Sequence, residues 1–188
     1  ILAHGFINIS GKKIGKSLGN VIGIDELVKR YGVDPLRYFL VREVPTTEDS
    51  DFSWEKFDVR YESDLANSLG NLISRVTNIA EKNEIDFIDL GSVGIDILKE
   101  VEERRLDKAL EKIWSVIHEA NKYVDETKPW SIKDDPEKLS EIINKLLNDI
   151  KSIGVALDPF MPETSEKILN VFKEEKIKKV EPLFPKQK

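Results

Sequence analysis

Apolar and polar residues follow two different patterns along the 188-residue chain, with a change near Phe52. Before this point, short apolar runs alternate with glycines and polar stretches. They predict a strand over residues 2–9, a polar loop over 12–20, a helix over 24–31 and a second helix from residue 34 to about 44. Asp34 is the expected N-cap of the second helix, because Pro35 follows it in the first turn. Residues 46–51 are polar and acidic, so we expect a connector and a domain boundary at residue 50.

After Phe52, apolar residues recur every three or four positions, which is typical of amphipathic helices. Ser53 can cap a long helix that reaches about Lys82. Apolar stripes predict three further helices over residues 106–120, 139–153 and 162–172. The chain is therefore expected to be mainly α, with an α-helical bundle over residues 51–175 after a short α/β region. Residues 176–188 form a lysine-rich tail with two prolines, which we expect to be poorly ordered.

The amino-acid composition excludes several classes of protein. Hydrophobic residues make up 40% of the chain and charged residues 34%, which excludes wholesale disorder. With no cysteine and two histidines, disulfides, thiolate chemistry and a multi-histidine zinc site are excluded, and we predict no metal site. No apolar stretch approaches the length of a membrane span. The only methionine is Met161, so we interpret the chain as a fragment of a longer, cytoplasmic polypeptide.

The polar loop has the chemistry of a phosphate-binding segment. Three lysines lie within five positions, glycines at 11 and 15 let the backbone approach an anion closely, and Ser17 adds a donor. A Walker A loop would need a glycine five residues before Gly15, and that position is Ser10. A P-loop is therefore disfavoured by spacing. The plainer alternative for a short lysine cluster is a solvated surface turn.

A second candidate site lies on the long helix. Placed on a helical wheel, five polar residues fall on the face away from the apolar stripe: Asn67, Asn71, Arg75, Asn78 and Lys82. Amides and guanidinium groups suit the edges of unstacked bases, and a tryptophan such as Trp130 offers a stacking platform. The alternatives are a solvated helix face and, for Trp130, a ring that closes the core. The net charge of −6 argues mildly against nonspecific nucleic-acid binding but leaves room for a local site.

A family resemblance connects these features. The segment Lys13-Ile14-Gly15-Lys16-Ser17 resembles the Lys-Met-Ser-Lys-Ser loop of class I aminoacyl-tRNA synthetases. It departs from that signature at Ile14, which replaces the methionine, and at Gly15, which lacks the hydroxyl of the first serine. The surrounding stretches also match, namely His4-Gly5 and residues 31–38. The run from residue 42 through 53 is most similar to the methionine-specific members, whereas the leucine, valine and isoleucine enzymes generally lack it.

The resemblance implies a short remnant of a Rossmann-type catalytic domain over residues 1–50, with stem-contacting helices, followed by an anticodon-binding bundle. It implies that Lys13, Ile14, Gly15, Lys16 and Ser17 close over ATP, bound with Mg²⁺, while methionine is activated. It also implies that Asn71, Arg75 and Trp130 read the CAU anticodon of tRNA(Met). The remaining motifs of such a site are absent, so the N-terminal catalytic half is an expected partner and the fragment should be inactive alone. The alternatives are another class I synthetase or a non-catalytic helical interaction module.

Overall fold

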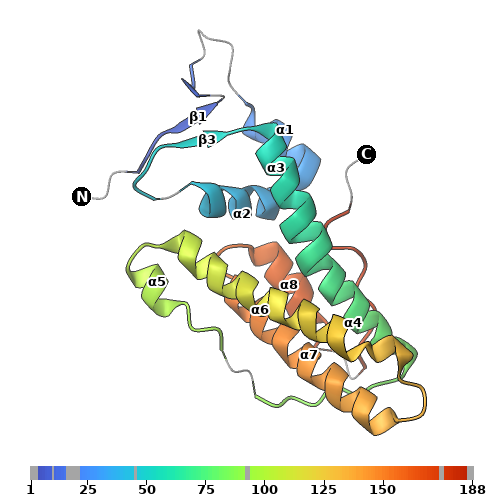
Figure 1. The fold of residues 1–188 in the computed structure, drawn as a ribbon. Coiled ribbons are helices and arrows are strands. Elements are labelled where there is room, and N and C mark those ends of the chain that lie inside the picture. The colour runs from blue at the N-terminus through green and yellow to red at the C-terminus, as the bar shows by residue number, and fades with distance from the viewer. Residues whose placement is uncertain are drawn as a thin grey trace.

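The computed structural model describes residues 4–9, 11–15, 22–44, 46–91, 94–173 and 176–185. A small α/β part and a helical bundle lie at the two ends of one long helix (Figure 1). The predicted fold class, mainly α with a short α/β region, is confirmed.

The α/β part contains a sheet with the strand order β2-β1-β3. Strand β1 (Ile7–Ile9) pairs antiparallel with β2 (Lys12–Lys13) and parallel with β3 (Ser50–Phe52). Two expectations were wrong here: the polar loop begins with a strand, and the acidic connector ends in one. Strand β3 forms because its partner lies more than forty residues away in the sequence, a pairing that local pattern does not reveal. The boundary predicted at residue 50 therefore falls inside β3.

Two helices, α1 (Ile24–Tyr31) and α2 (Val33–Glu43), follow as predicted, separated by Gly32 at φ 90°. A positive φ favours glycine, which explains the sharp break between them. Asp34 is not the N-cap of α2, because Gly32 occupies that position. The Asp34 side chain is buried and its Oδ2 accepts a hydrogen bond of 2.6 Å from the backbone N–H of Thr164. Asp34 thus caps a helix 130 residues away instead of its own.

The long helix runs without a break through α3 (Trp54–Arg60), the π-helical segment η2 (Tyr61–Gly70) and α4 (Asn71–Lys82). Ser53 caps it as predicted, since its side chain accepts a hydrogen bond of 3.2 Å from the N–H of Lys56. The ten-residue π segment was not predicted, because its apolar spacing also fits an α-helix. At its end, a Cβ on Gly70 would lie 3.1 Å from the Leu65 carbonyl oxygen.

The bundle consists of α5 (Leu98–Glu102), α6 (Leu106–Thr127), the short 3-10 turn η3 (Pro129–Ser131), α7 (Pro136–Leu157) and α8 (Pro162–Asn170). Together with α4, they enclose a core of fully buried aliphatic side chains that includes Leu72, Ile113, Ile143 and Leu146. Trp114 is 4% exposed within this core. The three predicted bundle helices are therefore confirmed, and α5 is an addition to them.

The irregular segment between α4 and α5 lies along α7 and is held by two asparagines. Asn144 accepts a hydrogen bond from the Ile88 N–H at 2.7 Å, and Asn148 accepts one from the Leu90 N–H at 3.0 Å. The Asn148 amide also donates to the Ile88 carbonyl oxygen at 2.9 Å. These side chains take the place of a strand partner at Ile88 and Leu90, whose backbone groups are thereby satisfied without a sheet.

The tail packs against the long helix, and the expectation of poor order is wrong for its described part. Ile177 and Phe184 are buried. The Tyr61 hydroxyl donates to the Pro185 carbonyl oxygen at 2.8 Å, and the Val180 N–H donates to Thr77 Oγ1 at 3.1 Å. The four apolar residues of the tail, Ile177, Val180, Leu183 and Phe184, stand among lysines and prolines that do not favour a regular element, so only the packed structure reveals their role.

Candidate nucleic-acid interface

Two residues predicted from distant parts of the sequence meet on the bundle surface. The guanidinium carbon of Arg75, on α4, lies 5.1 Å from the centroid of the Trp130 ring in η3. Arg75 Nη2 also donates a 3.0 Å hydrogen bond to Asp125 Oδ1 on α6. Trp130 is 51% exposed, so it does not close the core. The arrangement presents a flat aromatic surface and a planar cation side by side, and both can stack on an unpaired base.

The backbone around Trp130 explains its exposure. Lys128 adopts the left-handed conformation, with φ 45° and ψ 57°, and ends α6. Pro129 then starts η3 and is itself buried, which anchors the turn. The Ser131 hydroxyl donates to the Lys128 carbonyl oxygen at 2.7 Å and closes it. A buried proline on one side and a closed turn on the other hold the Trp130 ring outward.

Asn71, the third predicted reader, is exposed one turn before Arg75 on α4. It does not line the same pocket as Trp130. Instead, it borders a hollow of about 460 Å³ between the end of η2 and the tail, lined in part by Phe184 and Pro185. Asp125 was missed by sequence reasoning, because no local pattern indicates an ion pair across 50 residues.

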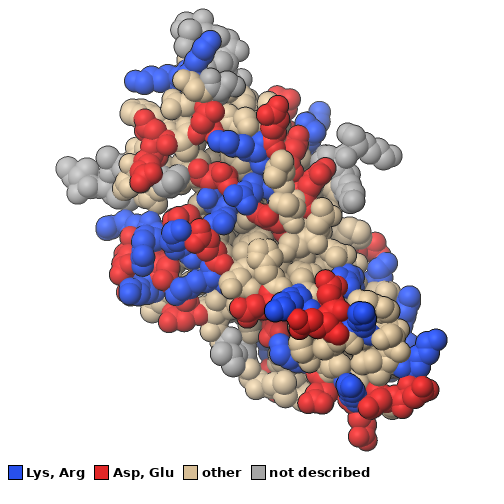
Figure 2. All heavy atoms as spheres, viewed as in Figure 1, with Lys and Arg blue, Asp and Glu red and all other residues tan. Residues whose placement is uncertain are grey.

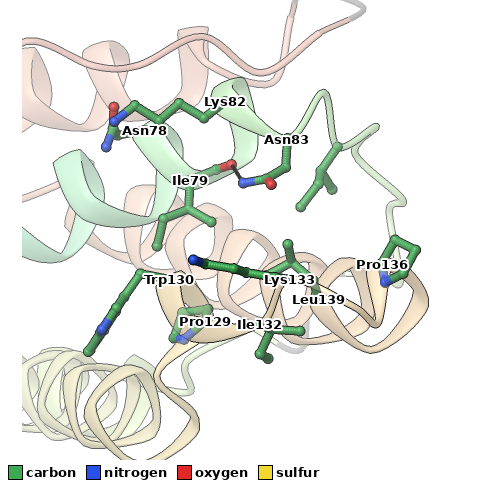
Figure 3. A pocket seen from close by; sticks show the side chains of 11 residues that line it. Asn78, Ile79, Lys82, Asn83, Pro129, Trp130, Ile132, Lys133, Pro136 and Leu139 are labelled. Carbon is green, nitrogen blue, oxygen red and sulfur yellow. Dashed lines mark hydrogen bonds between the residues drawn. The ribbon is translucent and has the colours of Figure 1, made fainter.

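A pocket of about 510 Å³ adjoins Trp130, between α4 and the segment that leads into α7 (Figure 3). Its charged lining residues are Lys82 and Lys133, and its polar ones include Asn78 and Asn83. Figure 3 shows the Lys133 side chain crossing the pocket below Ile79, with its ammonium group toward Trp130. Sequence reasoning placed Asn78 and Lys82 on the polar face but missed Lys133. The Lys-Pro-Trp context could have drawn attention to a cation three residues after Trp130.

The described start of the predicted ATP loop adjoins β1, at the opposite end of the molecule from the connection between α6 and α7 that contains Trp130 (Figure 1). Lys12 and Lys13 form β2, and Lys13 Nζ lies 5.6 Å from the centroid of the Phe6 ring. Ile14 is 47% exposed and is followed by Gly15, which is partly buried. Lys16 and Ser17 lie outside the described residues. A helix as long as residues 54–82 spans roughly 40 Å, so no small molecule contacts both candidate sites at once.

A polar network ties the small α/β part to the long helix. Arg60 donates to Glu43 at 2.6 Å and to Asp64 at 3.1 Å, and the Tyr38 hydroxyl donates to Asp64 at 2.7 Å. Burial, strengthened by the hydrogen bond to Asp64, raises the pKa of Tyr38 far above its ordinary value. Tyr38 therefore stays a neutral donor at every physiological pH. The network fixes α2 against the start of the π segment.

On the face drawn in Figure 2, basic and acidic side chains are interspersed over most of the surface. Such a surface favours local recognition over broad electrostatic attachment to nucleic acid. Within the described ranges, no three or more His, Asp or Glu side chains gather into a group that could hold a metal ion. None of the described helices is long and apolar enough to cross a membrane.

Comparison with known proteins bears on both parts of the chain. The family model of class I tRNA synthetases (M) matches residues 1–77. The model of the anticodon binding domain of methionyl tRNA ligase matches residues 93–184. The sheet and the helical bundle thus have the organisation of a class I aminoacyl-tRNA synthetase.

Individual relatives agree with this class. The methionine–tRNA ligase of Caldanaerobacter subterraneus subsp. tengcongensis is 41% identical over 187 residues, which cover 89% of this chain and 29% of that protein. The enzyme of Thermotoga maritima is 38% identical, over 89% of this chain and 29% of its own length. Methionyl-tRNA synthetase of Mycobacterium tuberculosis bound by methionyl-adenylate superposes with a TM-score of 0.83 at 27% identity, over 97% of this chain and 43% of that one.

The chain belongs to the methionyl-tRNA synthetase family. It spans about three tenths of the length of the first curated relatives it matches.

Proposed function

We propose that this chain carries the anticodon-reading bundle and the ATP-phosphate loop of an enzyme that activates methionine with ATP and esterifies it to tRNA(Met). Residues 1–50 supply the end of the catalytic domain with the loop and stem-contacting helices, residues 51–175 the anticodon-binding bundle, and 176–188 a tail. The rest of the active site comes from an N-terminal catalytic half of the same polypeptide. We also propose that the enzyme works in the cytoplasm, where translation consumes its product.

The observation that carries this proposal is the contact between Arg75 and the half-exposed Trp130, at 5.1 Å from cation to ring centroid. A solvated helix face would not need a tryptophan held outward by a closed turn. Trp130 provides the platform for one unpaired base of the CAU anticodon, and Arg75 donates to a base edge or stacks beside it. Asn71, one turn away on the exposed face, provides an amide for another base edge.

In the ATP loop, the lysines stabilise the negative charge of the phosphates. When the carboxylate of methionine attacks the α-phosphorus of ATP, pyrophosphate leaves and negative charge builds up on the phosphates. Lys13 and Lys16 stabilise that charge more in the transition state than in the ground state, which is how a lid of this kind accelerates the step. Ser17 and the backbone at Ile14 and Gly15 support the same phosphates. Magnesium enters with ATP as part of the substrate.

The test is binding of the 188-residue chain to an anticodon stem-loop with CAU, compared with the same stem carrying a scrambled loop, at a stated salt concentration. The chain is expected to prefer CAU. Replacing Trp130 with alanine should weaken CAU binding by about 5- to 150-fold, because stacking contributes roughly 1–3 kcal/mol per base. Equal affinity of the unchanged chain for both loops would contradict anticodon reading.

Matched variants separate stacking from simple charge or stability. Trp130→Phe keeps an aromatic face and should retain most of the preference for CAU. Arg75→Lys keeps the charge but loses the planar fork, so it should lose discrimination while keeping much of the affinity. The circular dichroism spectrum and thermal midpoint of each variant establish that the bundle is intact. If Trp130→Phe binds as weakly as Trp130→Ala, the ring is not a platform for a base.

A further inference from the structure

The pocket beside Trp130 differs in charge from the hollow between α6 and α7. Its only charged lining residues are Lys82 and Lys133, and no carboxylate lines it. The hollow between α6 and α7 is lined by Glu119, Glu126 and Asp149 besides its lysines. The chain as a whole carries a net charge of −6. A carboxylate-free, doubly cationic pocket on an acidic protein is suited to an anionic ligand.

Three polar side chains of this pocket are available for a ligand, whereas the fourth, the Asn83 amide, donates to the Ile79 carbonyl oxygen at 2.8 Å. Within the described ranges, no hydrogen bond or ion pair joins the side chains of Asn78, Lys82 or Lys133 to another residue. Asn78 and Lys82 lie one turn apart on α4, so both reach the same rim. Asn78 is half-buried, and an asparagine inside a helix costs helix stability and gains nothing structural when its amide is unpaired. Its presence is explained if the amide serves binding.

The floor of the pocket is apolar. It is formed by Ile79, Ile85, Ile132 and Leu139, of which Ile85 and Leu139 are buried. The volume of about 510 Å³ lies within the range of about 300–1,000 Å³ that is typical of small-molecule sites. An aromatic wall, an aliphatic floor and a cationic rim together fit a group that is flat and apolar on its faces, polar at its edge and anionic beside it. An unpaired nucleotide has this combination of properties.

We propose that this pocket is a second nucleotide subsite, which holds one unpaired nucleotide of the RNA loop in addition to the bases read by Asn71, Arg75 and Trp130. The base lies over Ile79 and Ile132, the Asn78 amide contacts its edge, and Lys82 and Lys133 bind the adjacent phosphates. Lys133 crosses the pocket in Figure 3 and moves aside on its flexible stem as the base enters. The inference rests on the proposed function, because it takes the ligand to be the anticodon loop.

The first test measures the salt dependence of binding to the CAU stem-loop. Each phosphate contact on a single strand contributes about −0.7 to the slope of log K against log salt. Lys82→Gln and Lys133→Gln should therefore each make the slope less steep by about 0.7, and the double variant by about 1.4. If affinities are equal at 1 M salt, a slope that is less steep by about 0.7 corresponds to roughly a fourfold loss of affinity per lysine at 0.15 M salt. Lys167→Gln, an exposed lysine on α8 with the same charge change, is the matched control and should leave the slope unchanged.

The second test separates the base from the phosphates. Asn78→Ala should leave the salt slope unchanged and reduce discrimination among the four bases at one position of the loop, because base contacts specify and phosphate contacts position. The lysine variants should weaken binding to all loop sequences equally. Each variant is first compared with the unchanged chain by thermal unfolding.

The outcomes distinguish this inference from the function on which it rests. If the unchanged chain prefers CAU and Trp130→Ala removes that preference, but Lys82→Gln and Lys133→Gln behave as Lys167→Gln does, the subsite is wrong and anticodon reading stands. If the lysine variants lower the slope while Asn78→Ala changes no base preference, the pocket binds phosphate only and the proposed base position is overturned. If the unchanged chain binds neither stem-loop, the proposed function fails, and the subsite with it.

Discussion

Replacing Asp34 with alanine should destabilise the chain by acting on a helix that is remote in sequence. Asp34 lies in the first turn of α2 and is 3% exposed. Its Oδ2 accepts a hydrogen bond of 2.6 Å from the backbone N–H of Thr164. Thr164 is the third residue of α8, and backbone N–H groups in the first turn have no partner within the helix. The variant would leave that buried N–H unpaired and remove a negative charge from the positive end of the α8 dipole.

The magnitude follows from three contributions. A hydrogen bond to a charged group contributes about 1.5–3 kcal/mol to stability. The gain in helix propensity from aspartate to alanine within α2 returns up to about 0.7 kcal/mol. Asp34 Oδ1 is buried without a partner among the described residues, so the cost of burying the carboxylate already offsets part of the native gain. The expected net loss is about 2 kcal/mol, which corresponds to a fall in thermal midpoint of roughly 4–8 °C for a chain of this size.

The assay is urea and thermal unfolding of the chain, followed by circular dichroism. Glu163→Ala is the matched control, because Glu163 is an exposed carboxylate one position before Thr164 on the same helix end. That change should shift stability by no more than about 0.5 kcal/mol. If Asp34→Ala is as mild as Glu163→Ala, the contact between α2 and α8 is not the source of stability and the reasoning is refuted.

Three further changes test other parts of the fold. Asn148→Ala should make the extended segment beside α7 markedly more susceptible to proteolysis, because it removes two hydrogen bonds to that segment. Unchanged cleavage would contradict the role given to this side chain. Gly154→Ala should lower the free energy of unfolding in urea by about 1–3 kcal/mol, because the new Cβ would lie 2.8 Å from a methyl carbon of Ile168. An unaltered midpoint would show that α8 shifts without cost to make room for it. Burial, with the hydrogen bond to Asp58, raises the pKa of Tyr31 from 10.0 to about 12. Its stabilising effect is therefore complete below pH 10 and is lost as the pH rises toward 12, and ultraviolet titration of Asp58→Asn should bring the tyrosine back toward 10.

Much of the fold follows from the sequence because apolar spacing is a local property. The helices over residues 24–31, 54–82, 106–127 and 136–157 bury apolar stripes that recur every three or four positions, and these stripes are covered where the helices pack together. Gly32 and Ser53 end and begin helices through their own backbone and side-chain chemistry, so their roles are legible without a structure. A helical wheel likewise placed Asn71 and Arg75 on one polar face, and the family resemblance then singled them out as candidate readers.

Other features depend on partners that sequence separation hides. Strand β3 exists because β1 lies beside it, and Asp34 caps α8 because the chain returns to it 130 residues later. The tail packs because Phe184 meets Tyr61 and Gly70, not because of any pattern within its own residues.

The candidate site also has features that the sequence determined and features that only the tertiary structure decided. Its residue types were set by sequence, since base stacking needs an aromatic ring and base edges need amides or guanidinium groups. How α4 packs against α6 and α7 decided that Arg75 meets Trp130 and pairs with Asp125. It also decided that the Lys133 side chain crosses the pocket below Ile79 (Figure 3). Helix periodicity fixes which residues share one face, whereas only the packed core fixes which faces lie close enough to make a pocket.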